Sequence, residues 1–274
     1  MRSYLPNTQI EIIDRAVARG HIRHALFDFD GTLSLIREGW QGVMIPMMVE
    51  LIRQAPGAED EATVHALVKE YVTRLTGRQT IYQMIRLAEE IEKRGGRPLE
   101  PLAYKRMYHE RLLERIEGRL RSLEAGRAAP DEMMVPGSRA MLEGLRARGV
   151  RCYLASGTDE PYVRHEAELL GIVGYFAGIY GAHDDYQAHE KRIVIQRIIA
   201  ENRLSGPEFV AFGDGYVEIE DTRAAGGIAV GVASDEARRE GIDEWKRSRL
   251  IEAGAQIIIP DFREHATLLE YLLG

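Results

Sequence analysis

Acidic side chains follow two apolar segments that have the character of buried strands. Asp28 and Asp30 come directly after the run at residues 25–27, and Asp214 follows the run at residues 209–212. Residues two apart on an extended chain point to the same side, so the carboxylates of Asp28 and Asp30 share a face. Like charges this close repel, so one must be protonated, paired or bound to a metal. A divalent cation is the simplest neutralisation, and ligation by oxygen alone favours magnesium over zinc.

These residue types suit the transfer of a phosphoryl group. A carboxylate can carry that group covalently, and a metal offsets the repulsion between the carboxylate and an anionic phosphate. The Ser156 hydroxyl and the Lys191 ammonium can hold the equatorial phosphate oxygens. Asp30 can donate a proton to the leaving alkoxide and then withdraw one from the attacking water. Gly31 permits a tight turn that brings its amide close to the phosphate.

A parallel sheet would bring these residues together, and the hydrophobic pattern predicts one. After residue 136, strand and helix patterns alternate at short spacing. The predicted strands are residues 150–155, 176–180, 209–212, 228–232 and 256–259, and the predicted helices are 139–148, 161–170 and 193–200. This alternation predicts a Rossmann-like α/β core, a parallel sheet with helices on both faces. Ligands bind at the carboxyl ends of such strands, where the polar residues lie.

Residues 34–134 have a different character, because they contain almost no strand signals. Apolar residues recur there at helical spacing, and glycines separate the helical segments. A further helix is predicted at residues 10–17 from similar spacing. The chain therefore reads as a catalytic core of residues 1–33 and 135–274, with an all-α cap domain of residues 34–134 inserted after the first strand.

Four short motifs, in order, resemble those of the haloacid dehalogenase (HAD) superfamily. They are DFDGTL at 28–33, LASGT at 154–158, Lys191, and GDGYVE at 213–218. The resemblance covers the α/β portion and implies a Rossmann-like core with a helical cap inserted after the first motif. It implies that Asp28 is the nucleophile and Asp30 the general acid/base. It also implies that the backbone carbonyl of Asp30, with Asp28 and Asp214, binds Mg²⁺.

The resemblance further implies that phosphate is bound by Ser156, Gly157 and Lys191. The fourth motif usually ends in aspartate, and Glu218 stands at that position. We expect Glu218 to reach the metal directly or through water, with Glu220 and Asp221 as nearby alternatives. The second acid of the first motif narrows the reaction class, because dehalogenases of this superfamily lack it and transport ATPases carry threonine there. An acid at Asp30 suits phosphatases and phosphomutases, whose leaving groups need a proton.

Three residues of the inserted segment are candidates for substrate binding. Arg37 lies near the expected hinge, and Arg78 and Gln79 lie in a turn between two helical patterns. In similar proteins such a loop reaches the active site and selects the leaving group, and an arginine can pair with a substrate carboxylate or hydroxyl. A plain interhelical turn explains the same residues equally well.

Two other readings of the acidic motifs fail on their spacing. A calcium loop starting at Asp28 would need glycine at its sixth position and glutamate at its twelfth, where the chain has Leu33 and Gly39. A dinucleotide-binding fingerprint starting at Gly213 would need a third glycine where Glu218 stands.

Composition limits the partners that we expect. The formal charge of −7 does not favour nucleic acid or an anionic membrane. Cys152 is the only cysteine and lies in an apolar run, which favours a buried thiol in a reducing compartment. No apolar stretch is long enough to span a bilayer. A cytoplasmic protein is expected, and its oligomeric state is not predicted. The histidines His183 and His189, in a polar loop, are expected to be solvated.

The sequence therefore predicts a Mg²⁺-dependent phosphatase for a small phosphorylated metabolite, such as a sugar phosphate or phosphoglycolate. A sugar phosphomutase with the same nucleophile is the main alternative. A phosphonate hydrolase would need an amine in the cap, and the lysines there have no distinguishing context. A degenerate binding protein is disfavoured because the chain retains Asp28, Asp30, Ser156, Lys191 and Asp214.

Overall fold

The computed structural model describes residues 2–185 and 190–274. The chain forms two compact units. Met1–Glu38 and Arg119–Gly274 form the first unit, which contains the sheet, and Gly39–Gly118 form the second, which is helical. The second unit begins and ends inside the segment predicted as a cap.

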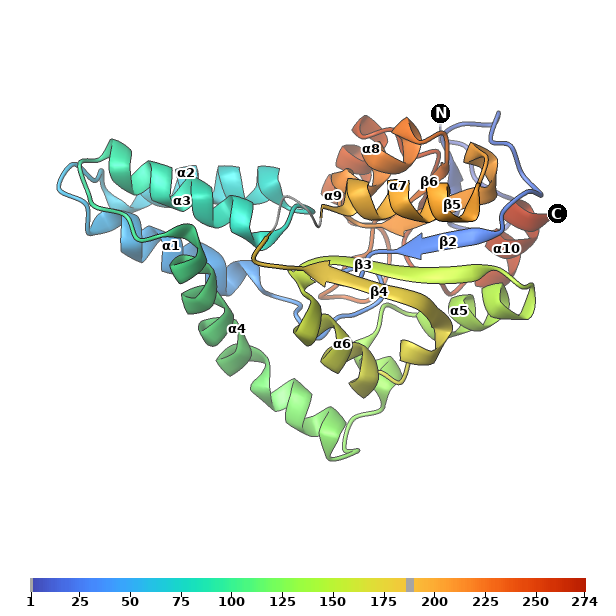
Figure 1. Cartoon of the computed structure of the whole chain (residues 1–274), viewed down its shortest axis with the longest axis horizontal. Coiled ribbons are helices and arrows are strands. Elements are labelled where there is room, and N and C mark those ends of the chain that lie inside the picture. Colours follow the sequence, from blue (N-terminus) through green and yellow to red (C-terminus); the bar gives the residue numbers. More distant parts are fainter. Residues whose placement is uncertain (1, 186–189) are drawn as a thin grey trace. The chain divides into compact units, whose positions relative to one another are not determined.

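The first unit is built on a seven-stranded sheet with the order β1-β7-β6-β5-β2-β3-β4 (Figure 1). The strands are β1 (Glu11–Ile12), β2 (His24–Phe27), β3 (Arg151–Asp159), β4 (Phe176–Ala182), β5 (Phe209–Gly213), β6 (Ile228–Val232) and β7 (Ile257–Ile259). All neighbouring pairs are parallel except β1 and β7, which are antiparallel. The predicted α/β fold with an inserted helical region is confirmed.

The helix predicted at residues 10–17 is wrong. This segment contains the edge strand β1, in which Glu11 pairs with Ile258 and Ile12 with Ile257. The backbone N–H of Ile13 also donates to the carbonyl of Gln256. The open edge of β7 offers the backbone partners that an extended segment can use. Ile13, which contributed to the helical spacing, is 38% exposed.

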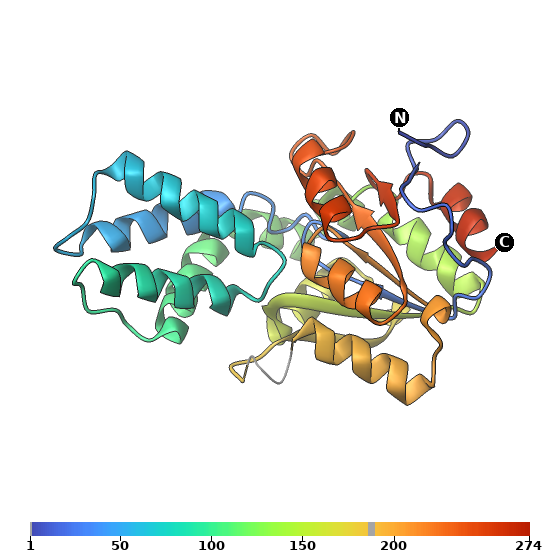
Figure 2. The same ribbon diagram turned by 90° about the horizontal axis from the view of Figure 1, so that it is seen from above.

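Helices cover both faces of the sheet (Figure 2). On one face lie α7 (Lys191–Asn202), α8 (Tyr216–Ala224) and α9 (Glu244–Glu252), each packed against its neighbour or the strands. On the other face α5 (Ser138–Ala147) packs against α10 (His265–Leu273), and α6 (Glu160–Leu169) contacts β3 and β4. The strand and helix pattern predicted for this part of the chain is therefore present, with boundaries shifted by a few residues.

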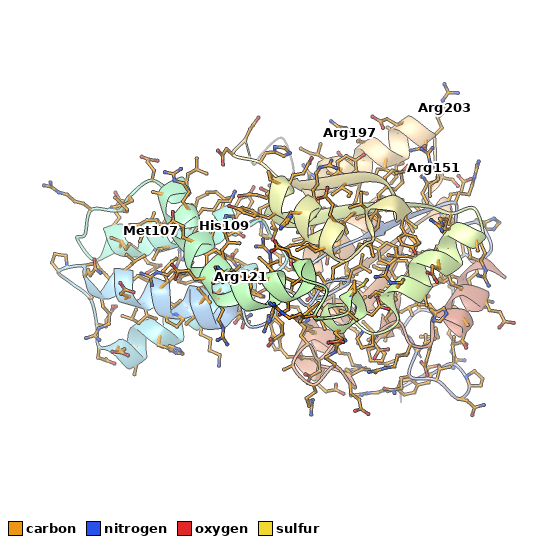
Figure 3. All side chains as sticks on the ribbon, turned by 90° about the horizontal axis from the view of Figure 1, so that it is seen from below. Met107, His109, Arg121, Arg151, Arg197 and Arg203 are labelled. Carbon is orange, nitrogen blue, oxygen red and sulfur yellow. The ribbon has the colours of Figure 1, made fainter. Side chains whose placement is uncertain are left out.

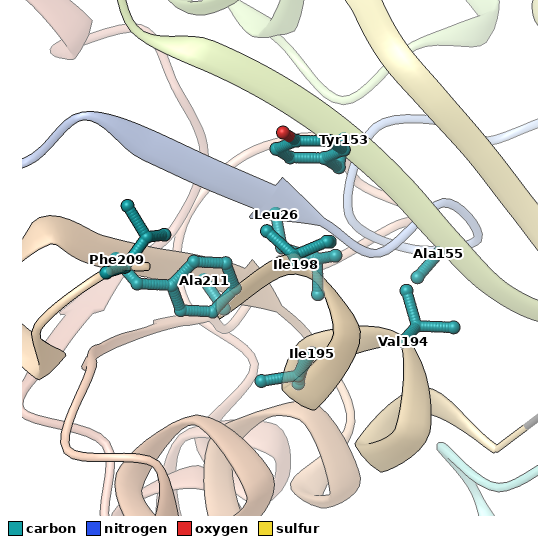
Figure 4. Close-up of a cluster of buried hydrophobic side chains, with 9 residues drawn as sticks. Leu26, Tyr153, Ala155, Val194, Ile195, Ile198, Phe209 and Ala211 are labelled. Carbon is teal, nitrogen blue, oxygen red and sulfur yellow. The ribbon is translucent and has the colours of Figure 1, made fainter. Parts of the chain in front are cut away.

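Alternation along the strands builds a core on each side of the sheet. Leu26 and Ala211 join the buried cluster under α7 (Figure 4). Phe27 and Phe212, the next residues along, stack on each other with ring centroids 4.7 Å apart. Because successive side chains of a strand point to opposite faces, these two layers come from the same short strands.

The second unit contains α1 (Gln41–Arg53), α2 (Glu61–Leu75), α3 (Thr80–Lys93) and the first part of α4 (Pro101–Glu124). Apolar residues spaced by three or four positions are buried in each of the first three helices, including Met44 and Met48 of α1 and Val64 and Val68 of α2. The helical character predicted for the insertion is therefore confirmed.

The two chain connections of the insertion meet within the first unit. Arg119 of α4 donates hydrogen bonds of 2.8 Å to the carbonyl oxygens of Ile36 and Glu38. A second nitrogen of its guanidinium lies 2.8 Å from the Glu38 carboxylate. The points where the chain leaves and re-enters the first unit are thus fastened to each other.

Two further expectations concern composition. Cys152 is buried in β3, and burial raises the pKa of its thiol to about 12, as expected for a structural cysteine. Among the described helices, none combines the length and apolarity that a bilayer span requires. The exposed arginines Arg151 and Arg203 lie at the start of β3 and just after the end of α7 (Figure 3).

Candidate active site

The first motif continues the central strand and then turns. The backbone N–H of Asp28 donates to the carbonyl of Phe212 at 2.9 Å, so Asp28 is still held by the sheet. Phe29 is fully buried, and Asp28 is 6% exposed. Phe29 therefore lies in the core between the two acids of the motif.

Glycine is required at position 31 because two carboxylates lie close to its backbone. Its φ is +75°, a conformation that residues with a Cβ rarely adopt. A Cβ at this position would also collide with the carboxylate of Asp214 and lie 3.0 Å from Oε1 of Glu236. The glycine of the first motif thus lets acids from the ends of β5 and β6 reach the turn.

Lys191 is buried because of its position in α7. It opens the helix, and Val194, Ile195 and Ile198 follow at three, four and seven residues, all buried in the cluster against the sheet. Residues at this spacing share one helix face, so Lys191 faces the sheet as they do. Its ammonium lies beyond the apolar cluster, near the carboxyl ends of the strands.

The Lys191 ammonium bridges two carboxylates. Its Nζ lies 2.7 Å from Oδ1 of Asp28 and 3.0 Å from Oε2 of Glu218. Burial raises the pKa of Asp28, and the charges of Glu218 and Asp214 raise it further, while Lys191 opposes the shift. Burial alone would lower the pKa of Lys191, but Asp28 and Glu218 outweigh it and raise that pKa. Lys191 therefore stays charged beside the proposed nucleophile.

Glu218 is held by its own helix as well as by Lys191. Its Oε1 accepts the backbone N–H of Gly215 at 2.7 Å, which satisfies a donor at the start of α8. A Cβ at Gly213 would collide with the Glu218 carboxylate. Glu218 is fully buried. The lack of a side chain at Gly213, at the end of β5, therefore leaves room for the longer side chain of Glu218.

Asp214 is paired with a lysine that the motifs did not indicate. Nζ of Lys246, on α9, lies 2.8 Å from Oδ2 of Asp214 and 2.7 Å from Oε1 of Glu236. Burial alone would lower the pKa of Lys246, but the two carboxylates raise it. Burial raises the pKa of Glu236, and Lys246 opposes that shift. Lys246 shares α9 with Arg247 and Arg249, and nothing in the sequence singled it out from them.

Asp30 accepts hydrogen bonds from two hydroxyls of β3. The Oγ of Ser156 lies 3.3 Å and the Oγ1 of Thr158 2.9 Å from its Oδ2. The strand was predicted to end at residue 155, but β3 runs to Asp159 and therefore includes Ser156 and Gly157. Among the described residues, Oδ1 of Asp30 has no hydrogen-bond partner. Asp30 thus has one oxygen held by two hydroxyls, while its other oxygen is buried.

Arg37 is buried in an ion pair within the first unit. Its guanidinium contacts the carboxylate of Glu166, on α6, through Nη2 at 2.6 Å and Nε at 2.9 Å. Its Nε also lies 3.9 Å from Oδ1 of Asp30. Burial raises the pKa of Glu166, and Arg37 opposes the shift. The structure thus places Arg37 beside the proposed general acid/base, and substrate binding by Arg37 stays a prediction.

The other two substrate-binding candidates lie in the second unit. Arg78 stacks over the ring of Tyr82 at 3.8 Å from the ring centroid. Gln79 is the residue before α3 and is buried. Their predicted contact with substrate stays a prediction. Of the two loop histidines, His183 has a half-exposed side chain near Glu160, and His189 lies outside the described residues.

Three carboxylates can converge on one cation. Asp28, Asp214 and Glu218 each offer an oxygen, and these oxygens all lie within 4.8 Å of one another. The backbone of Asp214 is fixed by its N–H, which donates to the Thr32 hydroxyl at 3.0 Å. Three oxygen donors, from the ends of β2 and β5 and from α8, suit a hard divalent cation such as Mg²⁺. These three side chains are among the predicted metal ligands, and ligation by the Asp30 carbonyl stays a prediction.

Comparisons with known proteins show which folds and which family this chain is similar to. No curated protein matches the sequence. Among solved structures, a β-phosphoglucomutase from Clostridium difficile is 12% identical with a TM-score of 0.60, covering 92% of this chain and 97% of that chain. A predicted phosphoglycolate phosphatase from Haemophilus somnus is 16% identical with a TM-score of 0.59, covering 90% and 98%. A HAD family hydrolase from Deinococcus radiodurans with bound phosphate and sodium is 16% identical with a TM-score of 0.54, covering 93% and 98%.

At these identities the similarity to solved structures shows the fold alone. The match of the sequence to a family model is the stronger evidence for the family. The model of one protein family, described as haloacid dehalogenase-like hydrolase, matches residues 22–226. That span contains Asp28, Lys191 and Asp214, which meet at the carboxyl edge of the sheet. Because the match covers most of the chain, this protein belongs to the haloacid dehalogenase-like hydrolase family.

Proposed function

We propose that this protein is a Mg²⁺-dependent phosphohydrolase that cleaves a small phosphomonoester through a phospho-aspartate on Asp28. The main supporting observation is the arrangement at the end of β2. A buried carboxylate, Asp28, lies 2.7 Å from a buried ammonium, and a second acid, Asp30, is held two residues later by hydroxyls. A nucleophile, a positive charge and a proton donor in one place are the parts that phosphoryl transfer needs.

The carboxylates of Asp28, Asp214 and Glu218 would hold Mg²⁺, since their oxygens are close enough to share one cation. The ion would supply Lewis-acid stabilisation of phosphate charge and would reduce the repulsion between Asp28 and an anionic substrate. Both Asp28 and Glu218 also contact Lys191. The residues therefore fit the ion that the family resemblance implies.

The reaction would proceed in two displacement steps, in which Asp28 is the nucleophile and Asp30 transfers the proton. In the first, a carboxylate oxygen of Asp28 bonds to phosphorus while the bond to the leaving oxygen breaks, and Asp30 gives that oxygen its proton. In the second, Asp30 takes a proton from water, the water oxygen bonds to phosphorus, and the bond to Asp28 breaks to release phosphate. Lys191 and the Ser156 hydroxyl would bind the phosphate oxygens that carry the transition-state charge.

A small phosphorylated metabolite, of the sugar phosphate or phosphoglycolate type, is the proposed substrate class. A phosphomutase would use the same two acids but would return the phosphoryl group to a second hydroxyl of the sugar. The solved structures of similar fold include proteins described as a phosphoglycolate phosphatase and as a β-phosphoglucomutase. Product analysis separates the two reactions, because only hydrolysis releases inorganic phosphate in proportion to substrate consumed.

The test is a phosphate-release assay on a panel of phosphorylated metabolites, with Mg²⁺ and with a chelator. We expect at least one substrate to be hydrolysed only with Mg²⁺, and we expect Asp28→Asn to abolish the activity. Asn has nearly the same shape as Asp but cannot form the phosphorylated intermediate. Circular dichroism and the Tm of Asp28→Asn check that the fold is kept. Full activity in Asp28→Asn would disprove the mechanism, and isomerised sugar phosphate without phosphate release would favour the mutase.

A further inference from the structure

Lys246 reaches the active site from an element that carries none of the recognised motifs. It lies on α9, in the first turn after Asp243, whose carboxylate accepts the backbone N–H of Trp245 and Lys246. Lys246 and Leu250 are the buried residues of this helix, and Leu250 packs in a core cluster with Ile258 of β7. Positions four apart share a helix face, so the packing of Leu250 directs Lys246 toward the sheet.

The Lys246 ammonium lies among three oxygen acceptors. Besides Asp214 and Glu236 at 2.8 and 2.7 Å, the hydroxyl of Ser234 lies at 3.4 Å. The Ser234 hydroxyl in turn donates to the carbonyl of Gly31 at 2.7 Å. Lys246 is 8% exposed. The loop between β6 and α9 is thus linked both to a proposed metal ligand and to the turn of the first motif.

We infer that Lys246, paired with Glu236, is a counter-ion of the metal site. It keeps Asp214 in position when no cation is bound, and its charge lowers the affinity of the site for Mg²⁺. This inference rests on the metal site proposed above. It assigns roles to two residues outside the segment at residues 22–226 that the family model matches.

The sign of the effect follows from charge. A fixed positive charge beside one ligand of a divalent cation repels that cation, and burial makes the repulsion stronger than in water. Glu236 offsets this repulsion, because its carboxylate contacts the same ammonium. Removing the lysine charge should therefore tighten Mg²⁺ binding, and removing the glutamate charge should weaken it. If Lys246 only oriented Asp214, its removal would instead weaken Mg²⁺ binding.

The test measures Mg²⁺ affinity by titration calorimetry on the full chain, without any assay of activity. We expect Lys246→Met to bind Mg²⁺ at least about tenfold more tightly than the wild type, and Glu236→Gln to bind it at least about tenfold more weakly. The double variant should return close to the wild type, since it removes both charges. Lys246→Arg keeps the charge and should also stay close to the wild type.

Arg247→Met is the matched control for lost stability. Arg247 is the next residue of α9 and forms a similar ion pair, with Nε 2.6 Å from the buried Glu11, away from Asp214. We expect it to lower the Tm without changing Mg²⁺ affinity. In Lys246→Met the Tm without metal should fall, and Mg²⁺ should raise it by more than in the wild type.

The outcomes separate this inference from the proposed function. Unchanged or weaker Mg²⁺ binding by Lys246→Met, alongside normal binding by the wild type, would overturn the counter-ion role and leave the metal site standing. Absence of Mg²⁺ binding by the wild type would overturn the metal site and this inference together. If Lys246→Met failed to fold, Lys246→Gln would be measured in its place, because it removes the same charge and keeps a hydrogen-bond donor.

Discussion

At the residue scale, the closest contacts of the proposed general acid/base are with hydroxyl groups, and the Arg37 guanidinium lies farther away, 3.9 Å from Oδ1 of Asp30. Thr158 and Ser156 both contact Oδ2 of Asp30, and the Ser156 hydroxyl also accepts the backbone N–H of Thr158 at 3.1 Å. Hydroxyls can rotate to donate to a carboxylate or accept from a carboxylic acid, so they suit a group that changes its protonation during each cycle.

Thr158→Val should lower kcat by about ten- to a hundredfold, because it removes a hydrogen bond to a charged group, worth roughly 1.5–3 kcal/mol, without changing the size of the side chain. Steady-state kinetics on the substrate found in the phosphate-release assay measures the change. Thr158→Ser keeps the hydroxyl and is the control. Wild-type kcat in Thr158→Val would show that Asp30 does not depend on this contact.

Some site residues could be predicted because they occur in the order of the four HAD motifs. They include Asp28, Asp30, Lys191 and Asp214. The structure brings Asp28, Lys191 and Asp214 into one group because the ends of neighbouring parallel strands meet. The supporting residues could not be predicted in the same way. Lys246 is one cation in a helix rich in cations, and only its register with Leu250 shows that it is buried.

At the scale of elements, Glu166 of α6 forms an ion pair with Arg37. The buried pair of Arg37 and Glu166 joins the loop after β2 to the helix after β3, next to Asp30. Its bidentate geometry provides the hydrogen bonds that a buried ion pair needs to offset the cost of desolvation. Arg37 was singled out from the sequence by its place near the hinge. Glu166 shares a helix face with Val163 and Leu170, which indicates burial, but nothing in the sequence identifies Arg37 as its partner.

Glu166→Gln should lower the free energy of unfolding by about 3 kcal/mol, because it leaves a buried guanidinium without its carboxylate. Urea denaturation followed by circular dichroism measures the loss. Glu160→Gln is a control on the same helix, since the pair of Glu160 and Arg164 is partly exposed and should contribute less than about 1 kcal/mol. Equal losses in the two variants would contradict a special role for the buried pair.

Asp221 of α8 makes the stability of the fold depend on pH. Burial, with the charges of Glu218, Glu190 and Glu220, raises its pKa to about 6, although Arg192 opposes the shift. The folded state therefore holds this proton more tightly than the unfolded state. The contribution of Asp221 is complete below the ordinary pKa of 3.8 and is lost as the pH rises through about 6.

Asp221→Asn should therefore have a higher Tm than the wild type above about pH 7 and an equal Tm near pH 4. Thermal melts of both proteins across this range measure the difference. A constant difference at every pH would assign the effect to packing instead of charge.

The elements themselves were largely predictable, and the exceptions have physical causes. The strands of the central sheet were found because short apolar runs between turn residues have few alternatives. The edge strand β1 was mistaken for a helix, because two ordered residues carry too little pattern and their partner, β7, lies more than two hundred residues away. The length of β3 was underestimated, since polar residues such as Ser156 and Thr158 lack the apolar signal of a strand.

At the scale of the whole molecule, the insertion is a separate compact unit joined to the first unit by two connections. The sheet and its two helical layers are all formed by residues of the first unit. Arg119 fastens the second connection to the first through Ile36 and Glu38. A short linker can therefore replace the second unit without stretching the chain.

A variant in which a short Gly-Ser linker replaces residues 39–118 should fold and melt cooperatively, because the core of the first unit is complete. It should still bind Mg²⁺, since Asp28, Asp214 and Glu218 all remain. Circular dichroism melts and titration calorimetry measure both properties. An Arg119→Met version of the same variant is expected to be less stable, and a linker variant without a cooperative transition would show that the first unit depends on the insertion.

The fastening of the two connections by Arg119 also has a consequence for the history of the protein. A segment whose two ends leave and return at one point can be exchanged, lengthened or lost in a single recombination event while the catalytic apparatus keeps its shape. Selection can then act on the inserted segment alone, so that new substrates are acquired without disturbing the acids that perform the chemistry.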